Sequence, residues 1–136
     1  MDCILYPEQY TVLYNVSFLS LGSCIYAVYN GHYVISLCPG GAFITSINYW
    51  RKPDYSWRRY VDMAYVKMSL IYHLYRAYKS QYMVEYYALI ILAISLYPIG
   101  VYYHKRKLFW YSTYAHCLLH IVSNIANVIL YSGKIM

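Results

Sequence analysis

Charged residues are scarce in this sequence, and their scarcity excludes an ordinary soluble domain. They make up 12% of the 136 residues, whereas hydrophobic residues make up 61%. A typical globular chain carries about 25% charged residues, and a soluble domain of this length could not bury so much apolar surface. We therefore expect an integral membrane protein.

Cysteine is also sparse, and no two cysteines form a Cys-x-x-Cys pair, so neither a zinc finger nor a disulfide framework is indicated. Three of the four lie within apolar stretches, where a thiol behaves as a small buried side chain. They are Cys3, Cys24, Cys38 and Cys117. The opening stretch MDCILYPEQ has no basic region of the kind that begins a secretory leader, and we expect no cleavable signal peptide.

The formal net charge of +6 comes from 11 Lys and Arg residues against 5 Asp and Glu residues. A basic excess also suits a nucleic-acid-binding protein, but here most cations lie between apolar runs. That placement is typical of membrane topology and of contact with lipid headgroups. We expect membrane lipids as partners and no nucleic acid. The sequence leaves open whether the chain forms an oligomer.

Apolar runs long enough to cross a bilayer, which takes about 20 residues, occur five times. They cover about residues 10–29, 33–50, 60–78, 82–103 and 112–131. The pattern predicts an all-α, polytopic transmembrane helical bundle forming a single domain over residues 1–136. The CPGG stretch at 38–41 should kink or break the second span. The third span is the most polar, so four spans plus one interfacial helix is an alternative.

The distribution of cations predicts the orientation of the bundle. Residues 51–59 contain four Lys or Arg residues and residues 104–110 contain three, and both loops fall on one side of a five-span protein. The other side has three, namely Arg76, Lys79 and Lys134. Because positively charged loops stay in the cytoplasm, we expect the N-terminus inside and the C-terminus outside.

Polar side chains from three predicted spans reach a similar depth on the cytoplasmic side. Ser46 lies near the end of the second span, Asp62 near the start of the third, and His116 and His120 near the start of the fifth. At about 1.5 Å per residue, all four lie within roughly 12 Å of the inner boundary. The i, i+4 spacing places both imidazoles on one helix face, where they could chelate one zinc ion.

This set of residues resembles the seven-span membrane hydrolases and receptors that include alkaline ceramidases and adiponectin/progestin-type receptors. In that group a Ser and a His four residues apart, an Asp about a dozen residues later and a final His-x-x-x-His form a zinc site. Ser46, Asp62, His116 and His120 match it, and the resemblance implies zinc, with His116 and His120 as metal ligands and Asp62 and Ser46 as catalytic residues. The chain departs from the pattern in having five expected spans and Trp50 at the position of the first His.

These residues leave three functions open. One is a reduced zinc-dependent hydrolase of membrane-lipid amides or esters, with Asp62 as the best candidate for a third ligand. Another is a non-catalytic structural or interaction protein, in which His116 and His120 form interhelical hydrogen bonds and Asp62 forms an ion pair with Arg58 or Arg59. Transport along the face of the last span is a third class, and it would require an oligomer.

Overall fold

The computed structural model describes residues 3–135, so the first two residues and the last of the predicted domain lie outside the described part. Every regular element in that part is an α-helix, which confirms the all-helical prediction. The helices are α1 (Pro7–Val16), α2 (Phe18–Tyr29), α3 (Tyr33–Trp50), α4 (Trp57–Ala77), α5 (Met83–Lys105) and α6 (Phe109–Ser132). Their bounds fall within a few residues of the five predicted spans.

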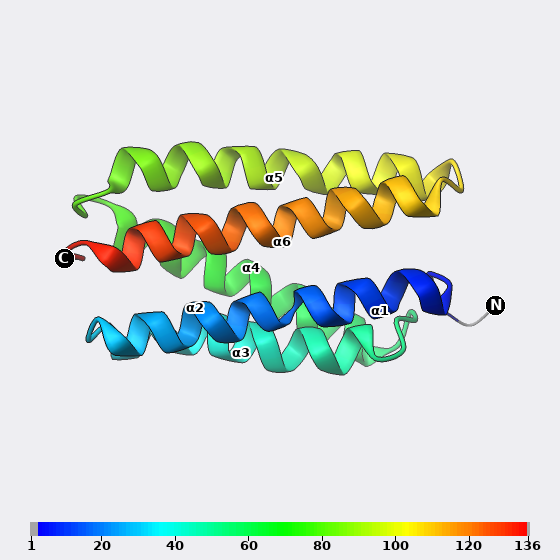
Figure 1. Cartoon of the computed structure of the whole chain (residues 1–136), viewed down its shortest axis with the longest axis horizontal. Helices are drawn as coiled ribbons and strands as arrows, with labels where there is room; N and C mark the ends of the chain where they lie inside the picture. The colour runs from blue at the N-terminus through cyan, green and yellow to red at the C-terminus, as the bar shows by residue number, and fades with distance from the viewer. Residues whose placement is uncertain (1–2, 136) are drawn as a thin grey trace.

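Helices α1 and α2 follow one another as a single rod that is interrupted at Ser17 (Figure 1). The Ser17 hydroxyl donates a hydrogen bond to the carbonyl oxygen of Leu13 at 2.8 Å, a contact that often bends helices. This rod (Pro7–Tyr29), α5 and α6 are each long and apolar enough to cross a membrane. Their length and composition fit a membrane protein; α3 and α4 are not among these three.

The five rods lie side by side and run alternately up and down the bundle, with α4 crossing obliquely between the α1–α3 group and the α5–α6 pair (Figure 1). At one end, which we call the N-terminal end, the Ile4 amide donates to the Pro53 carbonyl at 2.8 Å. His104 Nε2 donates to the Ile4 carbonyl at 3.1 Å. The segment before α1, the loop after α3 and the end of α5 therefore meet here.

The opposite end is held together in the same way. His32, after α2, donates from Nε2 to the carbonyl oxygens of Tyr131 at 3.1 Å and Gly133 at 3.2 Å. The Gln81 amide, after α4, donates to the Lys134 carbonyl at 2.9 Å. Since α3 and α4 each run from one bonded end to the other, they traverse the full bundle as the three apolar rods do.

Local sequence explains where several helices begin and end. Pro7 starts α1 at a position that needs no amide hydrogen, and the Gln9 side chain accepts a hydrogen bond from the Tyr6 amide at 3.0 Å. Gly31 ends α2 with a φ of 81°, the left-handed conformation that glycine adopts without strain. Lys107 ends α5 with a φ of 61°, where the sequence offers no glycine.

Pro39 lies inside α3, but the helix continues past it from Tyr33 to Trp50, so the CPGG stretch does not break the span. Gly41 has a separate role because the Tyr65 ring of α4 packs directly on it. A Cβ atom at Gly41 would lie 2.0 Å from the Tyr65 hydroxyl oxygen. The absence of a side chain at Gly41 therefore makes room for the Tyr65 ring, whose hydroxyl donates to the Leu37 carbonyl of α3.

Candidate functional site

Ser46 and Asp62, expected at one depth on neighbouring spans, are in direct contact. Ser46 Oγ donates a hydrogen bond to Asp62 Oδ1 at 3.1 Å, and Thr45 Oγ1 donates to the same oxygen at 2.8 Å. Both Ser46 and Asp62 are buried, with 2% and 8% of their surface exposed. The carboxylate thus joins α4 to α3. Thr45 was not among the predicted site residues, although a hydroxyl beside Ser46 was visible in the sequence.

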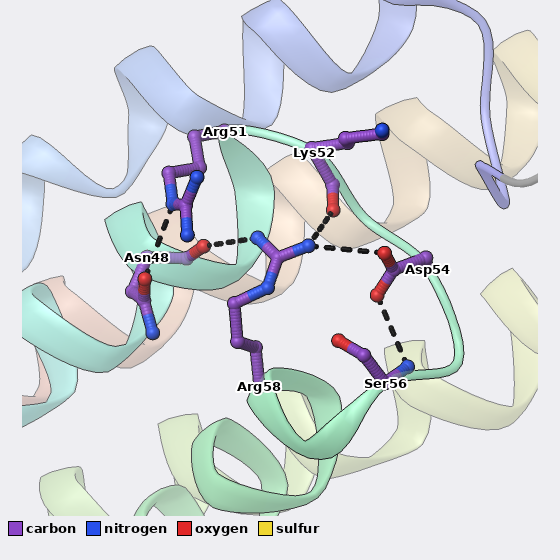
Figure 2. A network of polar contacts seen from close by, with 6 residues as sticks. All are labelled: Asn48, Arg51, Lys52, Asp54, Ser56 and Arg58. Carbon is purple, nitrogen blue, oxygen red and sulfur yellow. Dashed lines mark hydrogen bonds and ion pairs between the residues drawn. The ribbon is translucent and has the colours of Figure 1, made fainter.

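The ion pair considered for Asp62 does not form with Arg58. Arg58 Nη2 instead contacts Asp54 Oδ2 at 3.0 Å, and this is the one ion pair within residues 3–135. The guanidinium also donates to the carbonyl oxygens of Asn48 and Lys52, each at 2.8 Å (Figure 2). Arg58 is 7% exposed, so it is an internal clamp that closes the end of α3 against the start of α4.

Asp54 completes this clamp from the loop. Its Oδ1 accepts a hydrogen bond from the Ser56 amide at 3.0 Å (Figure 2). Hydrogen bonds from Ser56 and then the charge of Arg58 hold the pKa of the Asp54 carboxyl below its ordinary value of 3.8. The stretch of aromatic and basic residues between α3 and α4 therefore has a structural role: it caps the N-terminal end of the bundle.

His116 and His120 lie beside one another on α6, as the i, i+4 spacing predicted. Their ring centroids are 5.0 Å apart. The Trp50 ring, at the end of α3, meets His116 edge to face with a centroid distance of 5.1 Å. Trp50 Nε1 is buried and has no hydrogen-bonding partner within residues 3–135. Trp50, which occupies the position of the first zinc-binding His in the resembled group, is therefore in contact with the histidine pair.

Asp62 does not join the histidine pair to make a three-ligand group. Across residues 3–135, no three His, Cys, Asp or Glu side chains lie close enough together to hold one metal ion. Two separate polar clusters result: Asp62 with Thr45 and Ser46 between α3 and α4, and His116 with His120 and Trp50 between α3 and α6.

A shallow groove lies elsewhere, between α2 and α6, and its lining includes none of the four predicted site residues. It is lined by Leu19, Gly22, Ser23, Ile121, Asn124, Ile125, Val128 and Ile129. The polar atoms at its base are already bonded, because Ser23 Oγ donates to Asn124 Oδ1 at 2.6 Å. Asn124 Nδ2 in turn donates to the His120 carbonyl at 2.7 Å. The groove therefore presents an apolar surface.

A second interhelical polar contact lies toward the opposite end, where His73 of α4 meets Tyr131 of α6. His73 Nδ1 donates to the Ser69 carbonyl at 2.8 Å, so the neutral ring accepts at Nε2 from the Tyr131 hydroxyl. Both residues are buried. Neither this pair nor Ser23–Asn124 was predicted as a pair, because the rotation of each helix about its axis decides which side chains meet.

No protein-family model, curated protein or solved structure matches the chain. The relationship to the ceramidase and receptor group therefore stays a prediction that rests on the residues themselves.

Proposed function

We propose that this chain is a non-catalytic multi-pass membrane protein whose inward polar residues hold its helices together. The observation that carries the proposal is the bonding of Asp62: its buried Oδ1 accepts hydrogen bonds from both Thr45 and Ser46. A carboxylate oxygen occupied in this way links two helices, and it is not directed to a metal ion or a water held by the histidines. The Ser23–Asn124 contact links α2 to α6 in a similar way.

All five rods cross the membrane in this proposal. If the rod Pro7–Tyr29 spans the bilayer, then the hydrogen bond from Ile4 to Pro53 supports a return crossing by α3. The contact of Gln81 with Lys134 at the other end supports a crossing by α4. Asp62 and His73 of α4 are buried and bonded, which permits them in a bilayer. Lys67, at the middle of α4, is exposed, so a crossing by α4 requires its ammonium group to face water or another protein surface. The basic N-terminal end faces the cytoplasm.

A second candidate function keeps the histidine pair as part of a zinc site. The observation that favours it is the adjacency of the His116 and His120 rings at 5.0 Å, next to a buried Trp50 Nε1 that has no partner within residues 3–135. Two imidazoles can supply two of the four ligands that zinc takes. Water or a substrate oxygen would complete such a site, and the protein would hydrolyse an amide or ester of a membrane lipid.

Elemental mass spectrometry of the detergent-purified protein separates the two candidates. The protein should carry a tag without histidines, and the wild type is compared with His116→Ala/His120→Ala. The matched control is His32→Ala, because His32 lies at the opposite end and bonds backbone carbonyls. Our proposal predicts equally low zinc in all three proteins, and no turnover of short-chain ceramides or lysolipids with or without chelator.

Zinc at about one equivalent per chain, lost in the double variant and retained in His32→Ala, would contradict the proposal and favour the second candidate. Chelator-sensitive turnover that disappears with the metal would complete the case for a hydrolase. The folded state of each variant is checked by its unfolding transition, so loss of metal cannot be confused with loss of the bundle.

A further inference from the structure

The basic side chains of two separate loops form one surface at the N-terminal end of the bundle. Ile4 lies between them: its amide bonds Pro53 in the first loop, and its carbonyl accepts from His104 at the end of α5. Both bonds involve the same backbone residue, so the two loops are held within a short distance of each other. Figure 1 shows both connections at the N-terminal end.

Most cations on this surface contact no carboxylate within residues 3–135; Arg51 and Arg106 bond only the neutral side chains of Asn48 and Tyr102. Arg58 is buried and fully engaged with Asp54 and two carbonyl groups. Five others are exposed: Arg51, Lys52, Lys105, Arg106 and Lys107. Within residues 3–135 none of these five forms an ion pair with a carboxylate. Of the described acidic residues at this end, Asp54 is already bound by Arg58, and Glu8 is a single exposed carboxylate.

Aromatic residues place this surface at the depth of lipid headgroups. Trp57 at the start of α4 and Trp110 at the start of α6 are 66% and 43% exposed. Exposed indoles at the ends of membrane helices lie in the interfacial region. Arg106 also lies over the Tyr102 ring, with 5.5 Å from the guanidinium carbon to the ring centroid. The cations therefore project from the same level as the interfacial aromatic rings, where phospholipid phosphates are found.

We infer that the two loops together bind the headgroups of anionic phospholipids in the leaflet at the N-terminal end. Charge complementarity identifies the partner, since the five exposed cations form no ion pair within residues 3–135 and lie at the level where phospholipid phosphates are found. Lys and Arg near an anionic leaflet each strengthen binding by roughly fivefold. An acidic protein or a nucleic acid would need a surface reaching beyond the interface, whereas these side chains begin at the level of Trp57 and Trp110. The inference is independent of any metal at His116 and His120.

The test uses the full chain in a neutral detergent and measures binding of dioctanoyl phosphatidylglycerol, with dioctanoyl phosphatidylcholine as the neutral comparison. The loop variants are Arg51→Gln/Lys52→Gln and Lys105→Gln/Lys107→Gln. The matched control, Lys79→Gln/Lys134→Gln, removes the same charge from exposed positions at the opposite end. Inorganic phosphate and a polyuridine strand are titrated in parallel. Each variant is first checked for an unchanged unfolding temperature without lipid.

We expect the wild type to prefer the anionic lipid and each loop variant to lose affinity severalfold, while the control changes less than about twofold. Binding should also weaken as salt is raised from 0.1 to 1 M, where the screening length falls from about 10 to 3 Å. Equal binding of both lipids, an equal loss in the control, or binding of phosphate or polyuridine as tightly as the lipid would overturn the inference. If a loop variant fails to fold, the wild type alone still tests the inference, because it must prefer the anionic lipid and bind it more weakly at high salt.

Discussion

The Ile4 amide and the Pro53 carbonyl oxygen are 2.8 Å apart, and this hydrogen bond fixes the loop after α3 to the segment that enters α1. The contact matters because α3 and α4 are not among the three helical rods that are long and apolar enough to cross a membrane. A loop bonded to the segment before α1 lies at the same end of the bundle as that segment. The path of α3 and α4 through the bundle then follows from the chain's connectivity.

Asp62→Asn should be tolerated, whereas Asp62→Ala should destabilise the bundle. The amide oxygen of Asn can still accept hydrogen bonds from Thr45 and Ser46, but Ala removes both contacts between α3 and α4 and leaves Thr45 only the Ala42 carbonyl of its own helix. We expect Asp62→Ala to cost about 1–2 kcal/mol, since hydrogen bonds between membrane helices average about 0.6 kcal/mol each. Unfolding by dodecyl sulfate in mixed micelles measures both variants. Equal destabilisation by Asn and Ala would show that the charge, and not the pair of hydrogen bonds, matters.

Arg58→Gln should destabilise the protein far more than Arg51→Gln. Arg58 is buried and donates to Asn48, Lys52 and Asp54, so its loss leaves two carbonyl groups without this donor and leaves the Asp54 carboxylate only the Ser56 amide (Figure 2). Hydrogen bonds to charged groups contribute about 1.5–3 kcal/mol, and we expect a loss of about 2–3 kcal/mol. Arg51 is exposed, and its removal should change stability by less than about 0.5 kcal/mol. Similar effects of the two substitutions would contradict the clamp.

The contribution of Asp54 should depend on pH in a defined direction. Because its pKa is lower in the folded protein than its ordinary value of 3.8, Asp54 stabilises the fold above that value. The contribution is lost as pH falls further through the folded pKa. The difference in unfolding temperature between wild type and Asp54→Asn should be constant from pH 7 to 5 and should shrink below about pH 3.8. The comparison of wild type with Arg51→Gln, which removes no carboxylate, should show no such change.

Gly41→Ala and Gly22→Ala should have opposite effects although both glycines lie in helices. A Cβ atom at Gly41 would lie 2.0 Å from the Tyr65 hydroxyl oxygen, so the ring must move and its hydroxyl loses the hydrogen bond that it donates to the Leu37 carbonyl of α3. Overpacking of this kind costs about 1–3 kcal/mol. Gly22 has nothing within 4 Å of its would-be Cβ, so Ala should stabilise α2 by up to about 1 kcal/mol. Unfolding measurements in micelles compare the two variants. Destabilisation by both substitutions would contradict the claim that the Tyr65 contact makes Gly41 different from Gly22.

Most of the helices could be predicted from the sequence because they are long apolar runs separated by short polar segments; α4, which contains five charged residues, was the least certain of the predicted spans. The Ser46–Asp62 contact and the adjacency of His116 and His120 were also accessible, since depth and helical spacing determine them. The partners of Arg58 were not. An arginine at i−4 from Asp62 suggests an ion pair, but the loop folds back so that Asp54 and two carbonyl groups reach Arg58 first.

Contacts between helices that are distant in the sequence could not be predicted either. His73 and Tyr131 lie 58 positions apart, and Ser23 and Asn124 lie 101 positions apart. Hydropathy sets the position of a helix along the membrane normal, but it does not set the rotation that brings one polar side chain toward another. Trp50 was recognised as a departure from the expected zinc pattern, whereas its contact with His116 depends on how α3 and α6 are rotated.

The most direct test of the membrane arrangement is the side on which residue 52 lies. In a background in which the four cysteines are replaced by serine, Lys52→Cys, Lys79→Cys and Lys107→Cys are each labelled with an impermeant maleimide from one side of the membrane at a time. Five crossings place residues 52 and 107 together on the cytoplasmic side and residue 79 on the other. If residues 52 and 79 react from the same side, α4 does not cross the membrane, and the five-span account is wrong.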